Sequence, residues 1–583
     1  MNLTYHKTGT LIKQKFKDFF WPTVLSSMAA QLGTIINGIV VGNFISPHAM
    51  AAVSACVPLN QVTYALAVLI SIGASGLIAI AAGKRDNDGA NYIFTTVVAV
   101  SVFIGMLWAL LLIPNSYAVA IFLSSAEDLR ALVHEYLIIF VWRVPLYLMF
   151  FTWQTLIRTD GFAKIVSRGI LLGQVTNVIL SFTLVANGFG VTGAAVALIS
   201  GDIIAMSYVA KKYFSSSERT RNFCPIFNDF GKFISQVGGI LKAGIPIASG
   251  TALISVKVWA IYQILGQTGG ADAMTLYAIC MACLSVVSMC IAGCNGAMMP
   301  IIGMLYGEKD FSGVRILIKY VLRFALTLSG TFVGFAVFFP QIILSIYNVP
   351  PSLIASGEVA LRLFSISLIG VTVTFLAMYY YSTIQRRIAA NILSWTEGIV
   401  VVVPAAWILS KNFGLNGIWI AFILAELAGF AMIFIYTKTV CKNSGGKLND
   451  VFLIEKNAPD VLYDVSFKVD EDNAVKLYSE AVDVLKNNHI AEDVYLKVGV
   501  ALEEMTVHMT KINAGKIVDA DVRIKSESDK IIIAFRDNGK PFNPTEHHPN
   551  EDFNFDNIAM LKAMSKNINY NRVLSLNQTV IEI

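Results

Sequence analysis

The sequence predicts a polytopic α-helical membrane protein whose last transmembrane helix leads into a cytoplasmic α+β domain. Three observations support this fold class. Hydrophobic residues make up 55% of the 583 residues and charged residues only 14%, which is too little charge for a soluble protein of this size. Apolar stretches long enough to cross a bilayer, roughly 20 residues each, occur twelve times. The first six of these stretches recur as the last six.

The duplication has a fixed offset. Gly83 and Gly307 are 224 positions apart, and Asp86 and Asp310 are separated by the same number. Each copy holds six spans, an even number, so the two bundles share one orientation and are related by an axis along the membrane normal. We expect a cytoplasmic arm at 1–17, a first six-helix bundle at 18–212, a cytoplasmic linker at 213–236, a second six-helix bundle at 237–440, a linker at 441–449 and the cytoplasmic domain at 450–583.

The distribution of lysine and arginine predicts the orientation. Alternate loops contain basic pairs such as Lys84 and Arg85, whereas the opposite loops contain little beyond Arg130 and Lys411. Because cytoplasmic loops carry the excess of basic residues, we expect both termini in the cytoplasm and a multi-pass protein of the inner (plasma) membrane. Membrane lipid is therefore the first predicted partner. The net charge of +5 is small and predicts no nucleic-acid partner.

After residue 442 the long apolar stretches end and short alternating patterns begin. Val465–Val469, Val522–Ile524 and Lys530–Phe535 are typical of strands, because they are short and rich in β-branched and aromatic residues. Ala474–Lys486 and Val494–Ile512 have the periodicity of helices. The tail is therefore predicted to be an α+β domain of ordinary size.

Several short motifs follow one another along the transmembrane part, and some reappear in its second copy. They are Ile36–Asn43, Gly83–Asp86, Arg158–Gly161, Asn177–Leu180, Gly188–Gly193, Gly244–Pro246 and Gly414–Gly417. Through these motifs, residues 10–440 resemble the multidrug and toxic compound extrusion (MATE) transporters. The resemblance implies a V-shaped antiporter that expels organic cations or other small amphiphilic molecules, driven by inward movement of Na⁺ or H⁺.

The chain departs from the family pattern where an ion site is expected. Asn37 stands where the first span usually has an aspartate, and Ser181 stands where an aspartate usually follows Asn177 by four residues. Neither an amide nor a hydroxyl carries a proton that titrates near neutral pH. Gln174 and Asn177 are three positions apart and share a helix face. We expect this pair either to line the cavity or to join helices by hydrogen bonds.

The remaining candidates are charges inside predicted spans, which are costly unless they are paired. In the first bundle Asp202 and Arg143 have similar depth; Asp202 is the predicted coupling acid, and a structural ion pair between the two is the alternative. In the second bundle Lys257, Glu397 and Glu426 are the cavity candidates, and Glu426 stands 224 positions after Asp202. A structural Lys–Glu pair is the alternative there. No metal site is predicted.

Two motifs of the tail, Val500–His508 and Arg536–Pro544, resemble those of the histidine-kinase-type ATP-binding fold. The similarity is greatest to the anti-sigma-factor serine kinases. It implies that Glu504 is a general base and that Asp537 binds the adenine amino group, with Gly539 in the same turn.

Two features of the tail predict that this ATP site is degenerate. His508 stands at the family's magnesium-binding asparagine, and Phe555–Met560 lacks the glycines of the phosphate segment. Imidazole is a poor magnesium ligand, and backbone amides that approach phosphate closely need glycine. We therefore expect no kinase or ATPase activity and only weak binding of an adenine compound. The tail is expected to dock a cytoplasmic regulatory protein or to pack on the cytoplasmic loops.

These features predict a secondary transporter rather than an enzyme, an antiporter that exports amphiphilic or xenobiotic compounds and has a cytoplasmic regulatory domain. Two alternatives remain open. The missing acids and the kinase-like tail also fit a transporter-like receptor that signals through its tail. A flippase for a lipid-linked glycan belongs to the same broad superfamily, but it would need a strongly cationic cavity, to which only Arg143 and Lys257 contribute.

Overall fold

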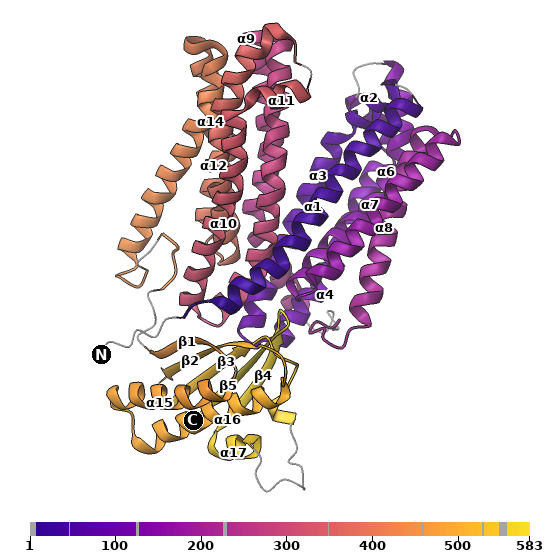
Figure 1. The fold of residues 1–583 in the computed structure, drawn as a ribbon. Helices are drawn as coiled ribbons and strands as arrows, with labels where there is room; N and C mark the ends of the chain where they lie inside the picture. The colour runs from indigo at the N-terminus through magenta and orange to yellow at the C-terminus, as the bar shows by residue number, and fades with distance from the viewer. Residues whose placement is uncertain are drawn as a thin grey trace.

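In this computed structural model the chain forms two helical lobes and a separate sheet domain (Figure 1). The described residues are 7–45, 47–123, 127–224, 230–347, 349–448, 451–455, 460–527, 530–546 and 557–583. For residues 47, 48, 50, 51, 127–129 and 271 the backbone alone is described.

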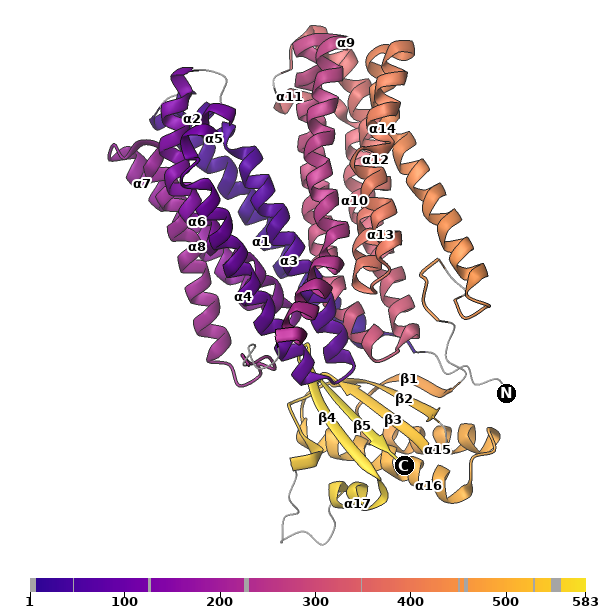
Figure 2. The same cartoon turned by 180° about the vertical axis from the view of Figure 1, so that it is seen from behind.

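The first lobe contains helices α1 to α8. Their bounds are α1 Thr10–Phe44, α2 Pro47–Ala55, α3 Val57–Gly83, α4 Asn87–Leu112, α5 Ser116–Leu123, α6 Glu127–Thr159, α7 Ala163–Ala186 and α8 Gly190–Phe214. The short helices α2 and α5 lie at the end of the lobe away from the sheet domain (Figure 2). The long helices expose apolar side chains such as Phe103 and Leu110, as expected of surfaces that face lipid.

The second lobe contains helices α9 to α14. Their bounds are α9 Phe230–Gly307, α10 Phe311–Phe338, α11 Pro340–Ile346, α12 Pro351–Thr383, α13 Arg387–Trp395, a π-helical turn Thr396–Val400 and α14 Val402–Asn443. Two glycines interrupt the longest helices with non-helical backbone angles, Gly270 (φ 63°) in α9 and Gly414 (φ 56°) in α14. Glycine adopts such positive φ values without steric penalty, so the chain turns sharply at both points.

Eleven helices among the described residues are long and apolar enough to cross a membrane. This confirms a polytopic helical membrane protein, although the sequence predicted twelve spans. The difference lies in Arg387–Asn443, a stretch of 57 residues that counts as one candidate and contains the turn at Gly414.

Helix α1 begins at Thr10, earlier than the predicted start of the first bundle at residue 18. Leu11, Ile12 and Phe16 are almost fully buried in a cluster that includes residues of the second lobe. These contacts extend the helix toward the amino terminus. A hydropathy window misses the first residues of α1 because the intervening lysines lower the mean hydropathy.

The two lobes converge beside the sheet domain and diverge toward the opposite end (Figures 1 and 2). At the converging end α3 packs directly on α9. A β-carbon at Gly83 would collide with the carbonyl oxygen of Met304, and one at Gly307 would collide with that of Ile80. Because these two glycines end their helices at equivalent repeat positions, the lobes meet backbone to backbone about a pseudo-twofold axis.

The sheet domain, residues 460–583 as described, is a five-stranded antiparallel sheet in the order β1-β2-β3-β5-β4. Its elements are β1 Val461–Lys468, α15 Glu471–Asn487, α16 Glu492–Ile512, β2 Asp519–Glu527, β3 Lys530–Asp537, a 3₁₀ turn Pro544–Glu546, α17 Asn557–Met564, β4 Asn567–Val573 and β5 Leu576–Glu582. The helices cover one face of the sheet, and the other face meets the lobes (Figure 2).

Alternation along the strands explains this two-sided packing. On β3, Ile531, Ile533 and Phe535 join the core beneath the helices, whereas Ala534 and Arg536 line the face toward the lobes. The predicted strands and helices of the tail coincide with β1, β2, β3, α15 and α16, except that Val465–Val469 extends one residue past the end of β1. The sequence analysis did not predict α17, β4 or β5. Strand β4 (NINYNRV) is mostly polar because part of it contacts the helical lobes.

The contact between α3 and α9 yields the first prediction. Gly83→Val places a branched side chain against the backbone of α9, and overpacking of this kind costs about 1–3 kcal/mol. The thermal unfolding temperature in detergent should therefore fall. Gly330→Val in α10 is the matched control, because nothing lies within 4 Å of a β-carbon there. Equal melting temperatures for the two variants would contradict the close packing of the lobes.

Candidate transport site

Three predicted polar residues, Asn37, Gln174 and Ser181, lie where α1 packs on α7, and the fourth, Asn177 of α7, lies against Gly201 of α8. Ser181 is fully buried, and its hydroxyl donates a hydrogen bond to Oδ1 of Asn37. The amide oxygen of Gln174 lies against Gly33, where a side chain on α1 would collide with it. Asn177 is 3% exposed, and its Oδ1 has no hydrogen-bond partner among the described residues. The group is neutral and polar, and Asn177 keeps one acceptor unused.

Arg143 of α6 and Asp202 of α8 form an ion pair in the same lobe. Nε of Arg143 lies 2.6 Å from Oδ2 of Asp202, and each side chain is 12% exposed. The guanidinium group also lies over the ring of Tyr147, 4.8 Å from its centroid. The two charges neutralise each other, which is the arrangement that the sequence analysis gave as the alternative to a coupling acid.

The three charged candidates of the second lobe form a single cluster. Nζ of Lys257 donates to Oε1 of Glu397 at 2.6 Å and to the carbonyl oxygen of the same residue at 3.0 Å. The carboxyl groups of Glu397 and Glu426 lie close enough to interact with each other. Lys257 and Glu426 are 5% exposed and Glu397 is 9% exposed. The structure thus brings together residues from three separate helical segments.

Two neighbours of this cluster were missed by sequence reasoning. Thr374 of α12 donates its hydroxyl proton to Oε2 of Glu426 at 2.6 Å. Gly370, one turn earlier on α12, leaves the space that the Glu426 side chain fills, since a β-carbon at Gly370 would lie 2.6 Å from its Cβ. Threonine and glycine do not stand out in an apolar span, so the sequence alone does not mark either residue as part of the site. Glu397 itself lies in the π-helical turn, a local widening often found at functional sites.

The candidates of the sheet domain fall into two groups. Oδ1 of Asp537 accepts hydrogen bonds from Gly539 N and from Asn577 Nδ2, both at 2.8 Å. Burial raises the pKa of the Asp537 carboxyl, and these two donors only partly oppose the shift. Glu504 accepts a hydrogen bond from Asn557 on the facing helix α17.

The ring of His508 packs on Phe542, with 4.4 Å between the ring centroids. The residue therefore faces an aromatic ring in the described structure. Of the predicted glycine-free segment Phe555–Met560, residues 555 and 556 lie outside the described residues, and the remainder belongs to α17.

A comparison with protein families decides which family the transmembrane part represents. The family model described as MatE matches residues 22–183 and again residues 246–408. The chain belongs to the MatE family. The first residues of the two matches are 224 positions apart, so the family match reproduces the internal duplication. Both matched segments lie before the sheet domain.

Relatives and solved structures of MATE transporters cover the same part of the chain. The multidrug export protein MepA of Staphylococcus haemolyticus is 24% identical over 449 residues, 75% of this chain and 95% of MepA. The probable multidrug resistance protein YoeA of Bacillus subtilis is 21% identical and covers 76% of this chain and 96% of YoeA. The outward-facing conformation of a multidrug resistance MATE transporter is 19% identical with a TM-score of 0.68, covering 74% of this chain and 96% of the other.

Membership of this family confirms the prediction of a MATE transporter rather than an enzyme. It favours export over the receptor and flippase alternatives. The V-shaped arrangement of the lobes agrees with the family fold. The matches do not extend the family to the tail, where the structure contains the small sheet with its three helices.

The ion pair of the first lobe yields the second prediction. Asp202→Asn leaves Arg143 without its counter-charge, and breaking a buried pair in this way costs roughly 3–5 kcal/mol. The variant should unfold at a markedly lower temperature in detergent. The double variant Arg143→Gln, Asp202→Asn removes both charges and should recover most of the loss. Additive losses in the double variant would show that the two residues act independently.

Proposed function

We propose that this MATE protein exports amphiphilic organic compounds, among them lipophilic cations, in exchange for protons. Membership of the family and the names of the relatives MepA and YoeA support the class of substrate. The choice of coupling ion rests on the two buried acids of the second lobe, Glu397 and Glu426, which we call the acid pair. This proposal replaces Asp202 with Glu426 as the coupling acid.

The proposed topology has twelve crossings with both termini in the cytoplasm of a cell whose plasma membrane holds the protein. Arg387–Asn443 supplies two of them, because 57 residues far exceed the roughly 20 that one crossing needs and Gly414 turns the chain in the middle. The basic turn at Lys84 and Arg85 lies beside the sheet domain, which marks that side as cytoplasmic. The lobes diverge on the other side, so the structure corresponds to an outward-facing state.

The neighbouring carboxyl groups of Glu397 and Glu426 would share a hydrogen bond if one of them held a proton. An ionised carboxylate is only an acceptor, so two carboxyl groups can share a hydrogen bond only if one of them is protonated. Lys257 pairs with Glu397 and keeps that group ionised. Glu426 is therefore the protonated partner, with Thr374 donating to its other oxygen. The cluster holds one positive and one negative charge and is neutral in this state.

Losing the proton from Glu426 would leave a net negative charge in a buried site. Such a charge is strongly unfavourable without a partner or water. Deprotonation must therefore accompany a rearrangement that admits water or a cationic substrate. The proton and a lipophilic cation would thus neutralise the same group in alternation, which is the exchange that an antiporter needs.

The same cluster argues against sodium as the coupling ion. Sodium would need several oxygen ligands, but the ammonium group of Lys257 already occupies Glu397 at 2.6 Å. A second cation at this carboxylate would be repelled by the first at short range. In the first lobe, the Asn37–Ser181 hydrogen bond and the Arg143–Asp202 pair leave no comparable shared carboxyl group among the described residues.

We further propose that the sheet domain has the histidine-kinase-type fold in a degenerate form and regulates transport. Two observations support the fold, the order of elements β-α-α-β-β-α-β-β and the placement of Asp537 and Gly539 in the turn after β3. Glu504 is engaged by Asn557 and His508 packs on Phe542, which are contacts of a packed core rather than of a magnesium site.

The acid pair yields the third prediction. Glu426→Gln preserves the shape of the side chain but cannot release a proton. In proteoliposomes with an imposed proton gradient, this variant should lose export of ethidium, used here as a probe lipophilic cation. Binding of ethidium in detergent should change little. A sodium gradient should drive no export in the unmodified protein.

The matched control is the double variant Arg143→Gln, Asp202→Asn, which removes the charges of the first lobe. It should retain proton-driven export. Retained export by Glu426→Gln together with loss in the first-lobe control would return the coupling role to Asp202.

The fourth prediction concerns nucleotide. Calorimetry of the full-length protein with ATP and Mg²⁺ should detect at most weak binding, because each lost charge-assisted phosphate contact removes roughly 1.5–3 kcal/mol. Asp537→Ala should abolish whatever binding remains, and omission of magnesium should leave it unchanged. Tight, magnesium-dependent binding would contradict a degenerate site.

A further inference from the structure

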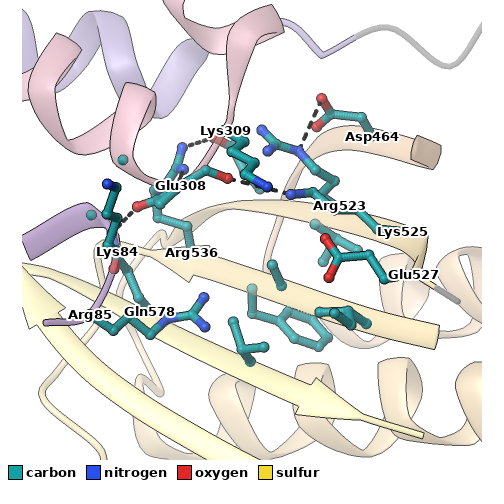
Figure 3. A pocket seen from close by; sticks show the side chains of 18 of the residues that line it. Lys84, Arg85, Glu308, Lys309, Asp464, Arg523, Lys525, Glu527, Arg536 and Gln578 are labelled. Carbon is teal, nitrogen blue, oxygen red and sulfur yellow. Dashed lines mark hydrogen bonds and ion pairs between the residues drawn. The ribbon is translucent and has the colours of Figure 1, made fainter. Parts of the chain in front are cut away.

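The sheet domain is attached to the second lobe through the turn between α9 and α10. Glu308 in this turn accepts from Arg536 of β3 and from Gln578 of β5. Asp310 accepts from Arg523 of β2 and lies 3.3 Å from Arg536. The basic residues that make these contacts come from the face of the sheet opposite its helices (Figure 3). We call this set of contacts the junction.

The amino-terminal segment reinforces the junction. Nζ of Lys7 lies 2.7 Å from Asp310 and 3.1 Å from Asp464 of β1. Ser312, at the start of α10, donates to the same Asp464 at 2.7 Å. The chain therefore ties its first described residues, the second lobe and the sheet into one charged network.

The turn between α9 and α10 differs from the equivalent turn of the first lobe. Its equivalent in the first lobe is Gly83–Asp86, where Lys84 stands at the position of Glu308. Asp86 and Asp310 both cap the helix that follows, each accepting from a backbone N–H at 2.8 Å. Asp86 is otherwise exposed, whereas Asp310 is fully buried beneath the sheet. One copy of a duplicated turn has thus acquired the opposite charge and a binding partner.

The junction is fully charged at neutral pH. Burial alone raises the pKa of the Asp310 carboxyl, but the surrounding cations, with Arg523 foremost, outweigh this and hold the pKa well below its usual range. A carboxyl with a depressed pKa loses its stabilising contribution only when the pH falls far enough to protonate it. The junction therefore persists across the physiological pH range.

The sheet domain also holds the first lobe, through the hairpin of β4 and β5. Leu574 at its tip is 2% exposed, in a cluster that contains Ala82 and Ala163 of the first lobe as well as Leu305 of the second. Asn571 of β4 donates to the carbonyl oxygen of Ala82 at 3.4 Å. Figure 1 shows the hairpin tip at the point where the lobes converge.

The interface between the sheet domain and the lobes is polar, as expected of domains that can separate. A cavity of about 270 Å³ lies between the turns and the sheet, lined by charges of both signs that include Lys84, Arg85 and Glu527 (Figure 3). Polar interfaces between domains of one chain usually permit relative motion. Undocking would expose ion pairs and a small apolar tip rather than a large hydrophobic core.

We propose that the sheet domain is a latch that fastens the cytoplasmic ends of both lobes and holds the transporter outward-facing. To reach an inward-facing state, α3 and α9 must part at Gly83 and Gly307. A domain bound to both lobes opposes this separation, so each transport cycle requires release from at least one lobe. The proposal rests on alternating access by the proposed transporter and adds its regulation.

Two single variants release opposite sides of the latch in the full-length protein. Glu308→Lys restores the charge of the equivalent first-lobe turn, which folds with lysine there, and breaks the contact with Arg536. Leu574→Ser removes the apolar tip from the first lobe. The control Glu358→Lys makes the same charge change on α12, where Glu358 contacts only Arg362 and Gln341 among its described hydrogen-bond partners.

Hydrogen–deuterium exchange in nanodiscs and ethidium export in proteoliposomes test the latch together. Both variants should raise amide exchange in residues 567–582 and at the ends of α3 and α9 beside the sheet domain. Both should also increase the initial rate of export severalfold, whereas the control should match the unmodified protein.

Three outcomes would overturn the latch. Unchanged exchange in both variants would mean that the junction and the hairpin do not hold the domain. Raised exchange in the hairpin with unchanged or slower export would mean that docking does not restrain the cycle. Raised exchange in the hairpin without any at α3 and α9 would mean that the lobes stay closed by themselves. If the unmodified protein exports no ethidium, the proposed function fails, but exchange at α3 and α9 still tests the latch.

Discussion

The close contact between α3 and α9 at the end beside the sheet domain is the constraint on which the rest of the structure depends. Gly83 and Gly307 allow the two backbones to touch, and a side chain at either position would push the lobes apart. This contact fixes the direction in which the V opens. It also places the two equivalent turns side by side, where one sheet can reach both. A single pair of duplicated glycines thus sets the shape of the transporter and the place where its sheet domain binds.

The duplication has not preserved the electrostatics of the two lobes. Asp202 is paired with Arg143, so these two charges of the first lobe neutralise each other. Its repeat equivalent, Glu426, lies beside a second acid, Glu397, and we propose that it holds the exchangeable proton. The same divergence occurs in the turns beside the sheet domain, where Lys84 is replaced by Glu308 in the second copy. In both cases the second copy has a partner that the first copy lacks: Glu426 lies beside Glu397, and Glu308 contacts the sheet domain.

The sequence was sufficient for those features that depend on composition and periodicity. Apolar length predicted the spans, the fixed offset predicted the repeat, and similar depth predicted that Arg143 and Asp202 could pair. The acid pair was not predicted as a pair, because Glu397 and Glu426 lie on different helices and a π-helical turn sets the orientation of Glu397. The junction joins residues as far apart as Glu308 and Gln578, 270 positions, so no local pattern could indicate it. The polar strand β4 was missed because it pairs with β5 and also places polar residues such as Asn571 against the lobes.

The central claim is that the acid pair of the second lobe exchanges a proton for substrate. Proton release on substrate binding tests it most directly, measured with a pH indicator in weakly buffered detergent solution on addition of ethidium. The account predicts release from the unmodified protein and from the first-lobe double variant, no release from Glu426→Gln, and no effect of sodium. Binding of ethidium without proton release, or undiminished release from Glu426→Gln, would contradict it.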